Sequence, residues 1–426
     1  MASNGAAAAE ESPASVGAEP TPILAMATGS CACDFKPMRM ARRPVGDYDV
    51  LFRMVACGIC HSDLHIARGH LEGVTGKVNY PLVPGHELAG ICTAVGSKVT
   101  KIAVGDHVGV GCMVDSCMKC KECLSGEEQK CSHKYGNVAT YNGKDRFGRA
   151  ATSPPGGSTI GGYSTAHVVH ESFAIKIPAE YPLASAGPVM CAGVTLFDPL
   201  RRYGTKAGTK VGIVGVGGLG TMGIKIAKAL GAEVTAISRG PSKEAYCRSA
   251  GADHFISSTD AAAMKAARGT LDLVMNTISA NHDYDVYTQL LAPGPNGKHI
   301  ILGLNNALGA AMIVDKITFG RSRVKMSGIG SIEATQAVID LCAKNNIHPE
   351  IKMVKANEIN SVYEALENGN DAGIRHVIDI EGSLTEAAFE ECKAPPPAFD
   401  SKDPNPGMST AGLLSEAAGM FFRGKW

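Results

Sequence analysis

The sequence has no excess of charge of either sign and no long apolar run. Lys and Arg together number 41, and so do Asp and Glu, so the formal net charge is zero. Nucleic-acid binding depends on clustered positive charge that neutralises phosphates, and this balance argues against a nucleic acid as the main partner. No segment approaches about 18 uninterrupted apolar residues, so we expect no membrane-spanning helix.

The N-terminal segment lacks the features of a targeting peptide. No Arg precedes Arg39, whereas Glu10, Glu11 and Glu19 are acidic. Transit peptides are rich in Arg and poor in acidic residues. We therefore predict a disordered tail over residues 1–33 and a cytoplasmic location, with a weak organelle address as the alternative. The 14 cysteines of this long chain also favour a reducing compartment over a disulfide framework.

The 426 residues suffice for two or three domains. Residues 34–190 contain short β-type runs between Gly and Pro. Residues 194–331 alternate β-rich runs with Ala-rich helical stretches, which is typical of βαβ units and a parallel sheet. A predicted helix at residues 334–344 and a strand at residues 376–380 follow. The chain is therefore of the α/β class.

A glycine-rich turn, Gly-Val-Gly-Gly-Leu-Gly, follows a predicted strand at residues 210–214 and precedes a predicted helix. Its first glycine permits a tight turn, the second lets the backbone approach a pyrophosphate, and the last lets the helix pack on the strand. The helix N-terminus attracts phosphate. We predict a dinucleotide site, with a purely structural turn as the alternative. Its residues are Gly215, Gly217, Gly218, Leu219 and Gly220.

The next predicted strand, residues 233–237, ends without an acidic residue. NAD-specific sites place Asp or Glu there to bind the ribose 2′-hydroxyl. Here Ser238, Arg239 and Lys243 supply a hydroxyl, a guanidinium and an ammonium. Because Arg pairs with phosphate in bidentate fashion, we predict a 2′-phosphate and hence NADP(H). A solvated basic turn is the alternative.

Four cysteines follow the spacing C-x2-C-x2-C-x7-C, at Cys117, Cys120, Cys123 and Cys131. We call them the four-cysteine group. Four thiolates so close in sequence suit one tetrahedral Zn²⁺ with no open position, which is a structural site. An iron–sulfur cluster is the less favoured alternative.

Cys60, His86 and Cys191 are candidate ligands of a second metal, and we call them the metal trio. Taken singly, each is more often a buried cysteine or a satisfied core histidine, and spacing alone does not join them. If they converge, two thiolates and one imidazole leave a fourth zinc position open for water or substrate.

Several segments together resemble the zinc-dependent medium-chain alcohol dehydrogenases, and within them the cinnamyl alcohol dehydrogenase-like, NADP-dependent branch. The resemblance spans residues 34–380. It rests on the four-cysteine group, the glycine-rich turn and four short segments. These are GICHSDLH at residues 58–65, PGHE at 84–87, GGYS at 161–164 and MCAG at 190–193.

The resemblance implies a GroES-like, β-rich catalytic domain into which a Rossmann domain with a doubly wound parallel sheet is inserted. The predicted catalytic domain comprises residues 34–191 and 335–382. The predicted NADP-binding domain comprises residues 192–334, and residues 383–426 form a C-terminal tail. The family also implies a homodimer built through edge strands of the Rossmann sheets.

The resemblance assigns a catalytic zinc to Cys60, His86 and Cys191, beside the structural zinc of the four-cysteine group. Glu87 is similar to an acid that approaches the metal when water exchanges. Asp63 matches an acid that supports the ligands.

A proton path is also implied. Ser62 and His65 match a relay that runs from the substrate oxygen through Ser62 and a cofactor ribose hydroxyl to His65 and solvent. His suits the last step because its unperturbed pKa is about 6.5. His61 is expected near the cofactor.

These features predict NADP- and zinc-dependent interconversion of primary alcohols and aldehydes, aliphatic or aromatic of the cinnamyl type. Zinc stabilises the alkoxide or polarises the carbonyl during hydride transfer. The alternatives are a polyol or secondary-alcohol dehydrogenase, a catalytically inactive binding or regulatory homologue, and a zinc-ribbon nucleic-acid module. The plant lignin enzymes carry a Trp shortly after their four cysteines. Because the only Trp here is Trp426, strict cinnamyl specificity is not predicted.

Overall fold

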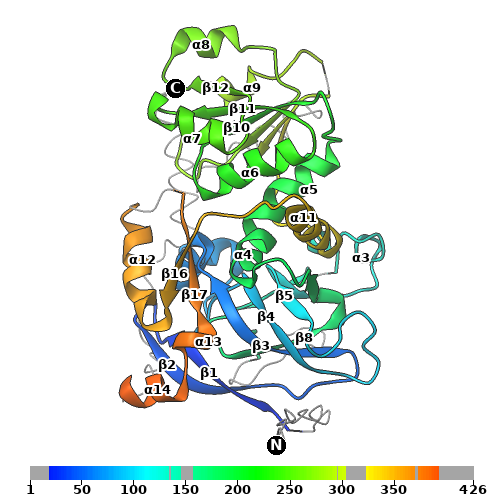
Figure 1. Ribbon diagram of the computed structural model, residues 1–426, viewed down its shortest axis with the longest axis vertical. Helices are drawn as coiled ribbons and strands as arrows, with labels where there is room; N and C mark the ends of the chain where they lie inside the picture. The colour runs from blue at the N-terminus through cyan, green and yellow to red at the C-terminus, as the bar shows by residue number, and fades with distance from the viewer. Residues whose placement is uncertain are drawn as a thin grey trace, which may run out of the picture.

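The computed structural model describes residues 19–133, 136–144, 157–294, 296–303, 323–369 and 373–392. The chain forms a β-rich domain around a seven-stranded sheet and a second domain around a six-stranded parallel sheet, which we call the parallel domain. In Figure 1 the parallel domain lies above the β-rich domain, with α5 and α11 between them. The predicted α/β architecture, with one domain inserted into the other, is confirmed.

The seven-stranded sheet joins strands from both ends of the described chain. Its order is β16-β17-β3-β4-β5-β9, with β8 paired to β3. Along β3 the buried residues Val50, Phe52 and Met54 alternate with half-buried ones, as expected when one face of a strand meets the core. The strands are β3 (Asp49–Gly58), β4 (Leu88–Val95), β5 (His107–Val110), β8 (Ala166–His170), β9 (Ile175–Ile177), β16 (Ile351–Lys355) and β17 (Arg375–Asp379).

After the parallel domain, the chain re-enters the β-rich domain at β17. This strand pairs antiparallel with β3, and Val377 lies opposite Gly58. Two short strands, β6 and β7, form a separate hairpin. The smaller elements are α1 (His61–Ala67), α2 (Glu72–Thr75), β6 (Met113–Asp115), α3 (Lys121–Leu124), η1 (Glu128–Lys130), β7 (Val138–Ala139), η2 (Glu171–Phe173), η5 (Ala356–Glu358), α12 (Ile359–Glu367) and α13 (Ile380–Ser383).

The prediction of a disordered tail over residues 1–33 is wrong for the part that the structure describes. Strand β1 (Thr21–Thr28) pairs antiparallel along its whole length with β2 (Phe35–Arg42). Residues 23–28 are all buried, so the apolar run ILAMA is core sequence. This two-sided burial hides the alternation by which an exposed strand is recognised. Residues 1–18 lie outside the described residues.

The predicted C-terminal tail also begins too early. Helix α14 (Glu386–Cys392) packs on β2, where Arg39 pairs with Glu386 at 2.7 Å and Glu390 at 3.0 Å. The Arg39 guanidinium lies 4.3 Å from the centroid of the Phe389 ring. Contacts with β2 therefore hold residues 386–392, which the sequence analysis placed in the C-terminal tail, against the β-rich domain. The rest of the predicted tail, residues 393–426, lies outside the described residues.

The parallel domain has the strand order β12-β11-β10-β13-β14-β15. The order reverses between β10 and β13, and ligands of such sheets bind at the carboxyl ends of the strands at this point. The predicted strands at residues 210–214 and 233–237 are confirmed. The elements are β10 (Lys210–Val214), α6 (Gly218–Ala229), β11 (Glu233–Ser238), η4 (Pro241–Lys243), α7 (Glu244–Ser249), β12 (His254–Ser257), α8 (Ala261–Ala266), β13 (Leu273–Asn276), α9 (Asp285–Thr288), β14 (Lys298–Ile301) and β15 (Val324–Met326).

One helix, Leu183–Arg202, runs between the two domains. It consists of α4 (Leu183–Pro188), a π-helical turn η3 (Val189–Gly193) and α5 (Val194–Arg202), and α11 (Ile332–Lys344) contacts it. The helix is long and apolar enough to cross a membrane, but 78% of its apolar window is buried inside the fold. Such burial is typical of a core helix, so this is weak evidence for a span. The predicted border between residues 191 and 192 falls within this helix.

Candidate active site

The first member of the metal trio, Cys60, is the N-cap of α1. Strand β3 ends at Gly58, where an added Cβ would lie 2.0 Å from Oε2 of Glu87, so only glycine fits. Asp63 at the third helical position accepts a hydrogen bond of 2.9 Å from the backbone N–H of Cys60. This reciprocal capping fixes the direction in which the Cys60 thiol leaves the helix.

The structure brings the metal trio together from three different elements. Cys60 and Cys191 have their Sγ atoms 3.9 Å apart, and Nε2 of His86 lies 3.3 Å from Sγ of Cys191. His86 precedes β4, and Cys191 lies in the π-helical turn η3. Such turns within helices are frequent at functional sites, because the extra residue redirects a side chain.

These side chains fit a zinc ion. Around one tetrahedral zinc, two sulfur ligands lie about 3.8 Å apart and a sulfur and an imidazole nitrogen about 3.6 Å apart. Glu87 adds a carboxylate, and the ligand atoms of all four residues lie within 4.8 Å of one another. Oε2 of Glu87 is buried without a hydrogen-bond partner in the described part of the chain. The donor set of two thiolates and one imidazole leaves a fourth position for substrate.

The Asp63 carboxylate holds the ligands in place. Its Oδ2 accepts from the backbone of Cys60 and from the phenol of Tyr163 at 3.2 Å. Its Oδ1 accepts from the backbone N–H of Gly85 at 3.2 Å and from Nδ1 of His86 at 3.0 Å. Asp63 is fully buried. The bond to Nδ1 fixes the tautomer of His86 and turns Nε2 toward the cysteines.

The buried Glu87 forms an ion pair with the half-buried Arg375 beside the trio. Nη1 of Arg375, on β17, donates to Oε1 of Glu87 at 3.1 Å. Burial raises the pKa of Glu87 to about 7, against the lowering effect of Arg375. Arg375 also reaches the other domain, because a Cβ placed on Gly218 would lie 3.9 Å from its Nε. Arg375 therefore pairs with Glu87 and has its Nε near the glycine-rich turn.

Sequence reasoning missed several residues of this site. Tyr363, on α12, has its hydroxyl 3.3 Å from that of Tyr163, which extends the chain behind Asp63. Tyr141 stacks on His86 with ring centroids 5.9 Å apart. The thiol of Cys112 lies beside that of Cys191 and away from the four-cysteine group. No local pattern marks these residues, because each enters the site through a contact distant in sequence.

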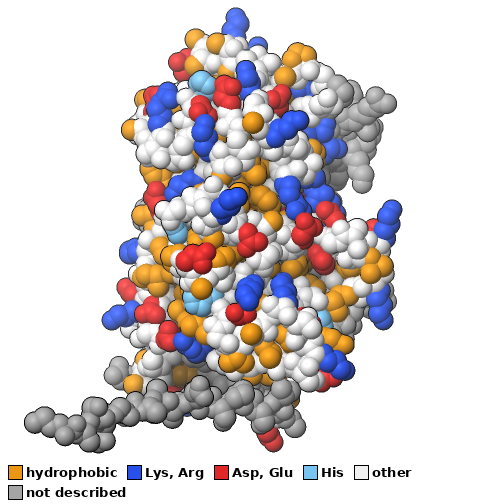
Figure 2. All heavy atoms as spheres, turned by 45° about the vertical axis from the view of Figure 1, so that its right-hand side comes forward, with side chains coloured by type: hydrophobic (Ala, Val, Ile, Leu, Met, Phe, Trp, Pro, Cys, Tyr) orange, Lys and Arg blue, Asp and Glu red, His pale blue; other side chains and the backbone are white. Residues whose placement is uncertain are grey.

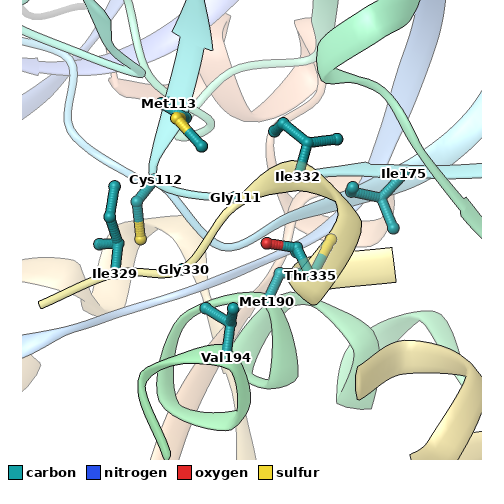
Figure 3. Close-up of a pocket in the computed structure, with 10 residues that line it drawn as sticks. All are labelled: Gly111, Cys112, Met113, Ile175, Met190, Val194, Ile329, Gly330, Ile332 and Thr335. Carbon is teal, nitrogen blue, oxygen red and sulfur yellow. The ribbon is translucent and has the colours of Figure 1, made fainter. Parts of the chain in front are cut away.

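A small apolar pocket adjoins the trio at the junction of the domains. Figure 3 shows the Cys112 sulfur directed toward the segment that carries Ile329 and Gly330, with Val194 on the opposite wall. Met190 and Val194 flank Cys191 along the interdomain helix. The lining is Gly111, Cys112, Met113, Ile175, Met190, Val194, Ile329, Gly330, Ile332 and Thr335.

Helix α1 carries the three predicted relay and cofactor-proximal residues. Ser62 and His65 are half-buried, and His61 is exposed. The rings of His61 and His65 have centroids 6.4 Å apart. His65 also contacts His70, with their Nδ1 atoms 3.2 Å apart.

The four-cysteine group closes on itself in a lobe beside α3. Cys120 Sγ lies 3.4 Å from that of Cys123 and 3.9 Å from that of Cys131, and Cys117 Sγ lies 3.8 Å from that of Cys123. These separations suit four thiolates around one zinc. Arg202 at the end of α5 pairs with Glu127 of this lobe at 2.8 Å. The lobe is thus tied to the interdomain helix.

The glycine-rich turn has the geometry that its sequence predicts. Gly215 has a φ of +85°, and an added Cβ would lie 2.8 Å from Oγ1 of Thr277. A Cβ on Gly220 would lie 1.9 Å from the carbonyl oxygen of Gly215, so α6 packs directly on the strand end. A Cβ on Gly217 meets nothing within 4 Å. This open backbone at the start of α6 could receive a pyrophosphate.

The basic turn lies at the end of β11. Ser238 is the last residue of β11. Arg239 follows it, is exposed and has no carboxylate partner in the described residues. Nζ of Lys243 donates to the carbonyl oxygen of Val216 at 2.7 Å, which brings the ammonium against the glycine-rich turn. The arrangement suits a phosphate on the adenosine ribose.

Comparisons with known families match both domains. The Alcohol dehydrogenase GroES-like domain family matches residues 46–179, and the Zinc-binding dehydrogenase family matches residues 218–344. Together these segments cover more than half of the chain.

Relatives and solved structures extend the match. The chain is 42% identical to "Probable cinnamyl alcohol dehydrogenase 3" of Oryza sativa subsp. japonica, over 83% of this chain and 92% of that protein. It is 40% identical to "Aldehyde reductase YahK" of Escherichia coli (strain K12), over 84% and 98%. The solved structure of CAD from Helicobacter pylori complexed with NADP(H) superposes with a TM-score of 0.74 and 36% identity, covering 86% of this chain and 100% of that one.

Proposed function

The chain belongs to the family of zinc-binding dehydrogenases with an alcohol dehydrogenase GroES-like domain and interconverts alcohols and aldehydes, and we propose that it does so at the metal trio. The convergence of Cys60, His86 and Cys191 carries this proposal. Zinc held there supplies a Lewis acid that lowers the pKa of a bound hydroxyl or polarises a carbonyl. Asp63 keeps His86 in the tautomer that can bind the metal.

We propose NADP(H) as the second substrate. It accepts hydride from the alcohol or returns hydride to the aldehyde. The open backbone at Gly217 supports a pyrophosphate site, and Ser238, Arg239 and Lys243 support a 2′-phosphate site. A relative described as an NADP-dependent alcohol dehydrogenase, from Mycolicibacterium smegmatis, is 40% identical over 84% of this chain.

Oxidation of an alcohol releases one proton, which must leave a buried site. Ser62 and His65 lie on α1 directly after the ligand Cys60, and both are half-buried. We assign Ser62 as the hydroxyl nearest the substrate and His65 as the group that passes the proton outward. His61 is exposed beside them and lies on the cofactor side in this proposal.

The relatives support the substrate class. They include a probable cinnamyl alcohol dehydrogenase and an aldehyde reductase, each at least 40% identical to this chain. We therefore favour primary alcohols and aldehydes, aliphatic or aromatic, over polyols. The balanced charges of the chain also favour a small molecule over a nucleic acid as the partner. In Figure 2, acidic and basic side chains are interspersed over the visible face.

We propose a cytoplasmic homodimer. In the described part of the six-stranded sheet, β15 is the edge strand, and its Met326 is 39% exposed. An exposed edge strand offers unpaired backbone groups to a second copy. The proposed catalytic domain comprises β1 in addition to residues 34–191 and 335–382, and the proposed NADP-binding domain comprises residues 192–334.

The test removes one ligand at a time. In His86→Ala and Cys60→Ser, alcohol oxidation and aldehyde reduction should fall to background, NADPH binding should persist, and one of two zinc ions should be lost. Cys31→Ser, at a half-exposed cysteine outside both metal groups, is the control. Full activity in the ligand variants would refute the assignment. A kcat/KM panel of aliphatic, aromatic and polyol substrates tests the substrate class.

A further inference from the structure

At the C-terminal end of α1, the side chain of His70 contacts that of His65. Gly69 follows the helix with a φ of +74°. The backbone N–H of Gly69 donates to the carbonyl of Ile66, and that of His70 donates to the carbonyl of His65, both at 2.9 Å. These two hydrogen bonds form a Schellman motif. In this motif the second residue after the C-cap, here His70, lies against the third residue before it, here His65.

That pair of positions usually holds two apolar side chains in contact. Here it holds His65 and His70, with Nδ1 atoms 3.2 Å apart and ring centroids 5.5 Å apart. His65 is half-buried and His70 is exposed. Because a hydrogen bond between two imidazole nitrogens needs one donor and one acceptor, the rings share one proton between their Nδ1 atoms.

We propose that His70 is the outer member of a two-histidine proton exit, receiving the proton from His65 and delivering it to water. The proposal rests on the dehydrogenase function and deepens it. His70 acts through His65 and is a positioning residue: it fixes the tautomer of His65 so that Nε2 is free to accept a proton from the buried side.

The step balances without any further reactant. His65 takes up a proton at Nε2 and gives the proton on its Nδ1 to Nδ1 of His70. His70 then loses the proton on its own Nε2 to water, so both rings are neutral again. The original tautomers return when His70 swings away and both rings exchange protons with water. Rotamer changes of exposed side chains take nanoseconds or less, far faster than a typical turnover of about 10 per second.

The surroundings favour proton loss from His65. Burial lowers the pKa of His65, and the neighbouring His70 and His61 lower it further, while Cys60 acts in the opposite direction. A proton that arrives on His65 is therefore held weakly and moves outward.

The other charged groups near this end of α1 have partners of their own. Glu367, on α12, pairs with Arg68 at 2.8 Å. Glu72, on α2, accepts the backbone N–H of Val78 at 2.9 Å. Asp63, on α1 itself, is bound to His86. In the described residues, His70 is thus the outward partner of His65.

The test uses the full-length holoenzyme and the pH dependence of alcohol oxidation. In His70→Gln, kcat at pH 6 should fall by about five- to tenfold, less than the roughly 10²- to 10⁴-fold that a general acid or base typically contributes, because water can partly replace the lost imidazole. The acid limb of the profile should move to higher pH, because the charge that lowers the pKa of His65 is gone. Added imidazole should restore the rate, and the KM for NADP⁺ should not change.

His254→Gln is the matched control, because His254 is an exposed histidine paired with Glu233 in the parallel domain. A His70→Gln enzyme with the wild-type profile would overturn the proposal, and so would an equal loss at every pH without rescue by imidazole. His70→Ala should behave in the same way and guards against an effect of the Gln side chain. If the wild-type enzyme does not oxidise alcohols with NADP⁺, the proposed dehydrogenase function is wrong. If the wild-type enzyme is active and His70→Gln is unaffected, only the proposed role of His70 is wrong.

Discussion

The phenol of Tyr163 donates a 3.2 Å hydrogen bond to Oδ2 of Asp63, whose other oxygen accepts from Nδ1 of His86. Tyr163 and Asp63 are both fully buried and lie 100 residues apart in sequence. The bond connects the segment after β7 with the first turn of α1. A residue that touches no ligand of the metal directly therefore helps to orient one.

Asp63→Asn should loosen the metal of the trio. An amide cannot accept the four hydrogen bonds that the carboxylate accepts, and loss of such support typically costs about 10- to 100-fold in metal affinity. Tyr163→Phe removes only one bond and should have a smaller effect in the same direction. The measurement is the rate of zinc release to a chromogenic chelator, with the slower zinc of the four-cysteine group as internal reference.

Tyr181→Phe is the control for Tyr163→Phe, because its hydroxyl is also buried and donates to the carbonyl of Ile347 at 2.7 Å, away from the trio. Equal release rates in Asp63→Asn and wild type would contradict the supporting role of Asp63.

Arg239→Ala should raise the KM for NADPH by about tenfold or more and that for NADH much less. A hydrogen bond to a charged group is worth about 1.5–3 kcal/mol, and only NADPH carries the 2′-phosphate. Steady-state kinetics with both cofactors test this. Lys206→Ala removes an exposed cation before β10, at the opposite end of the strand, and should leave both KM values unchanged. Parallel losses for NADPH and NADH would exclude a phosphate contact.

Cys123→Ser should destabilise the fold without removing the metal trio. A ligand present at about a thousandfold above its Kd contributes about 4 kcal/mol to stability, and a loss of this order is expected when the zinc leaves. Denaturant unfolding and metal content per chain report the effect, with Cys31→Ser as control. A variant that keeps two zinc ions and wild-type stability would contradict a structural zinc.

Stability should fall in mild acid because of His299. It is fully buried, with Nδ1 bound to Thr288 at 2.8 Å and Nε2 bound to Asn276 at 3.1 Å. Burial, helped by His282, lowers its pKa to about 3. Below its unfolded pKa of about 6.5 the unfolded chain binds a proton that the folded chain refuses, so this contribution is complete above pH 6.5 and is lost as the pH falls.

Between pH 6.5 and pH 5 the loss from this one group is about 2 kcal/mol. His299→Gln cannot titrate and should reduce the acid sensitivity by that amount, although it can lower stability at pH 7. Urea unfolding of both proteins at the two pH values gives the comparison. The same acid slope in the variant would assign the effect to other groups.

Local sequence patterns predicted several strands and helices of the parallel domain. The strand at residues 210–214, the turn that begins at Gly215 and the helix after it depend on neighbours within a few residues, so period and glycine spacing suffice to predict them. Strand β1 was not predicted. Because it is buried on both faces, its sequence is a continuous apolar run without the alternation of apolar and polar residues that marks a half-exposed strand. The π-helical turn at Cys191 was not predicted, and all five of its residues are buried within the interdomain helix.

The sequence by itself determined the residue types: thiolates and imidazole for zinc, glycines for a phosphate, and a basic turn in place of an acid. Only the tertiary structure decided which of them meet. Cys60 and Cys191 are separated by 131 positions, and no spacing rule spans that distance. The sheet and the interdomain helix bring them to 3.9 Å, because burial of the strands and helices that carry them fixes their relative position. The same reason explains why the contacts of Tyr363, Arg375 and Cys112 with the site were found only in the folded chain.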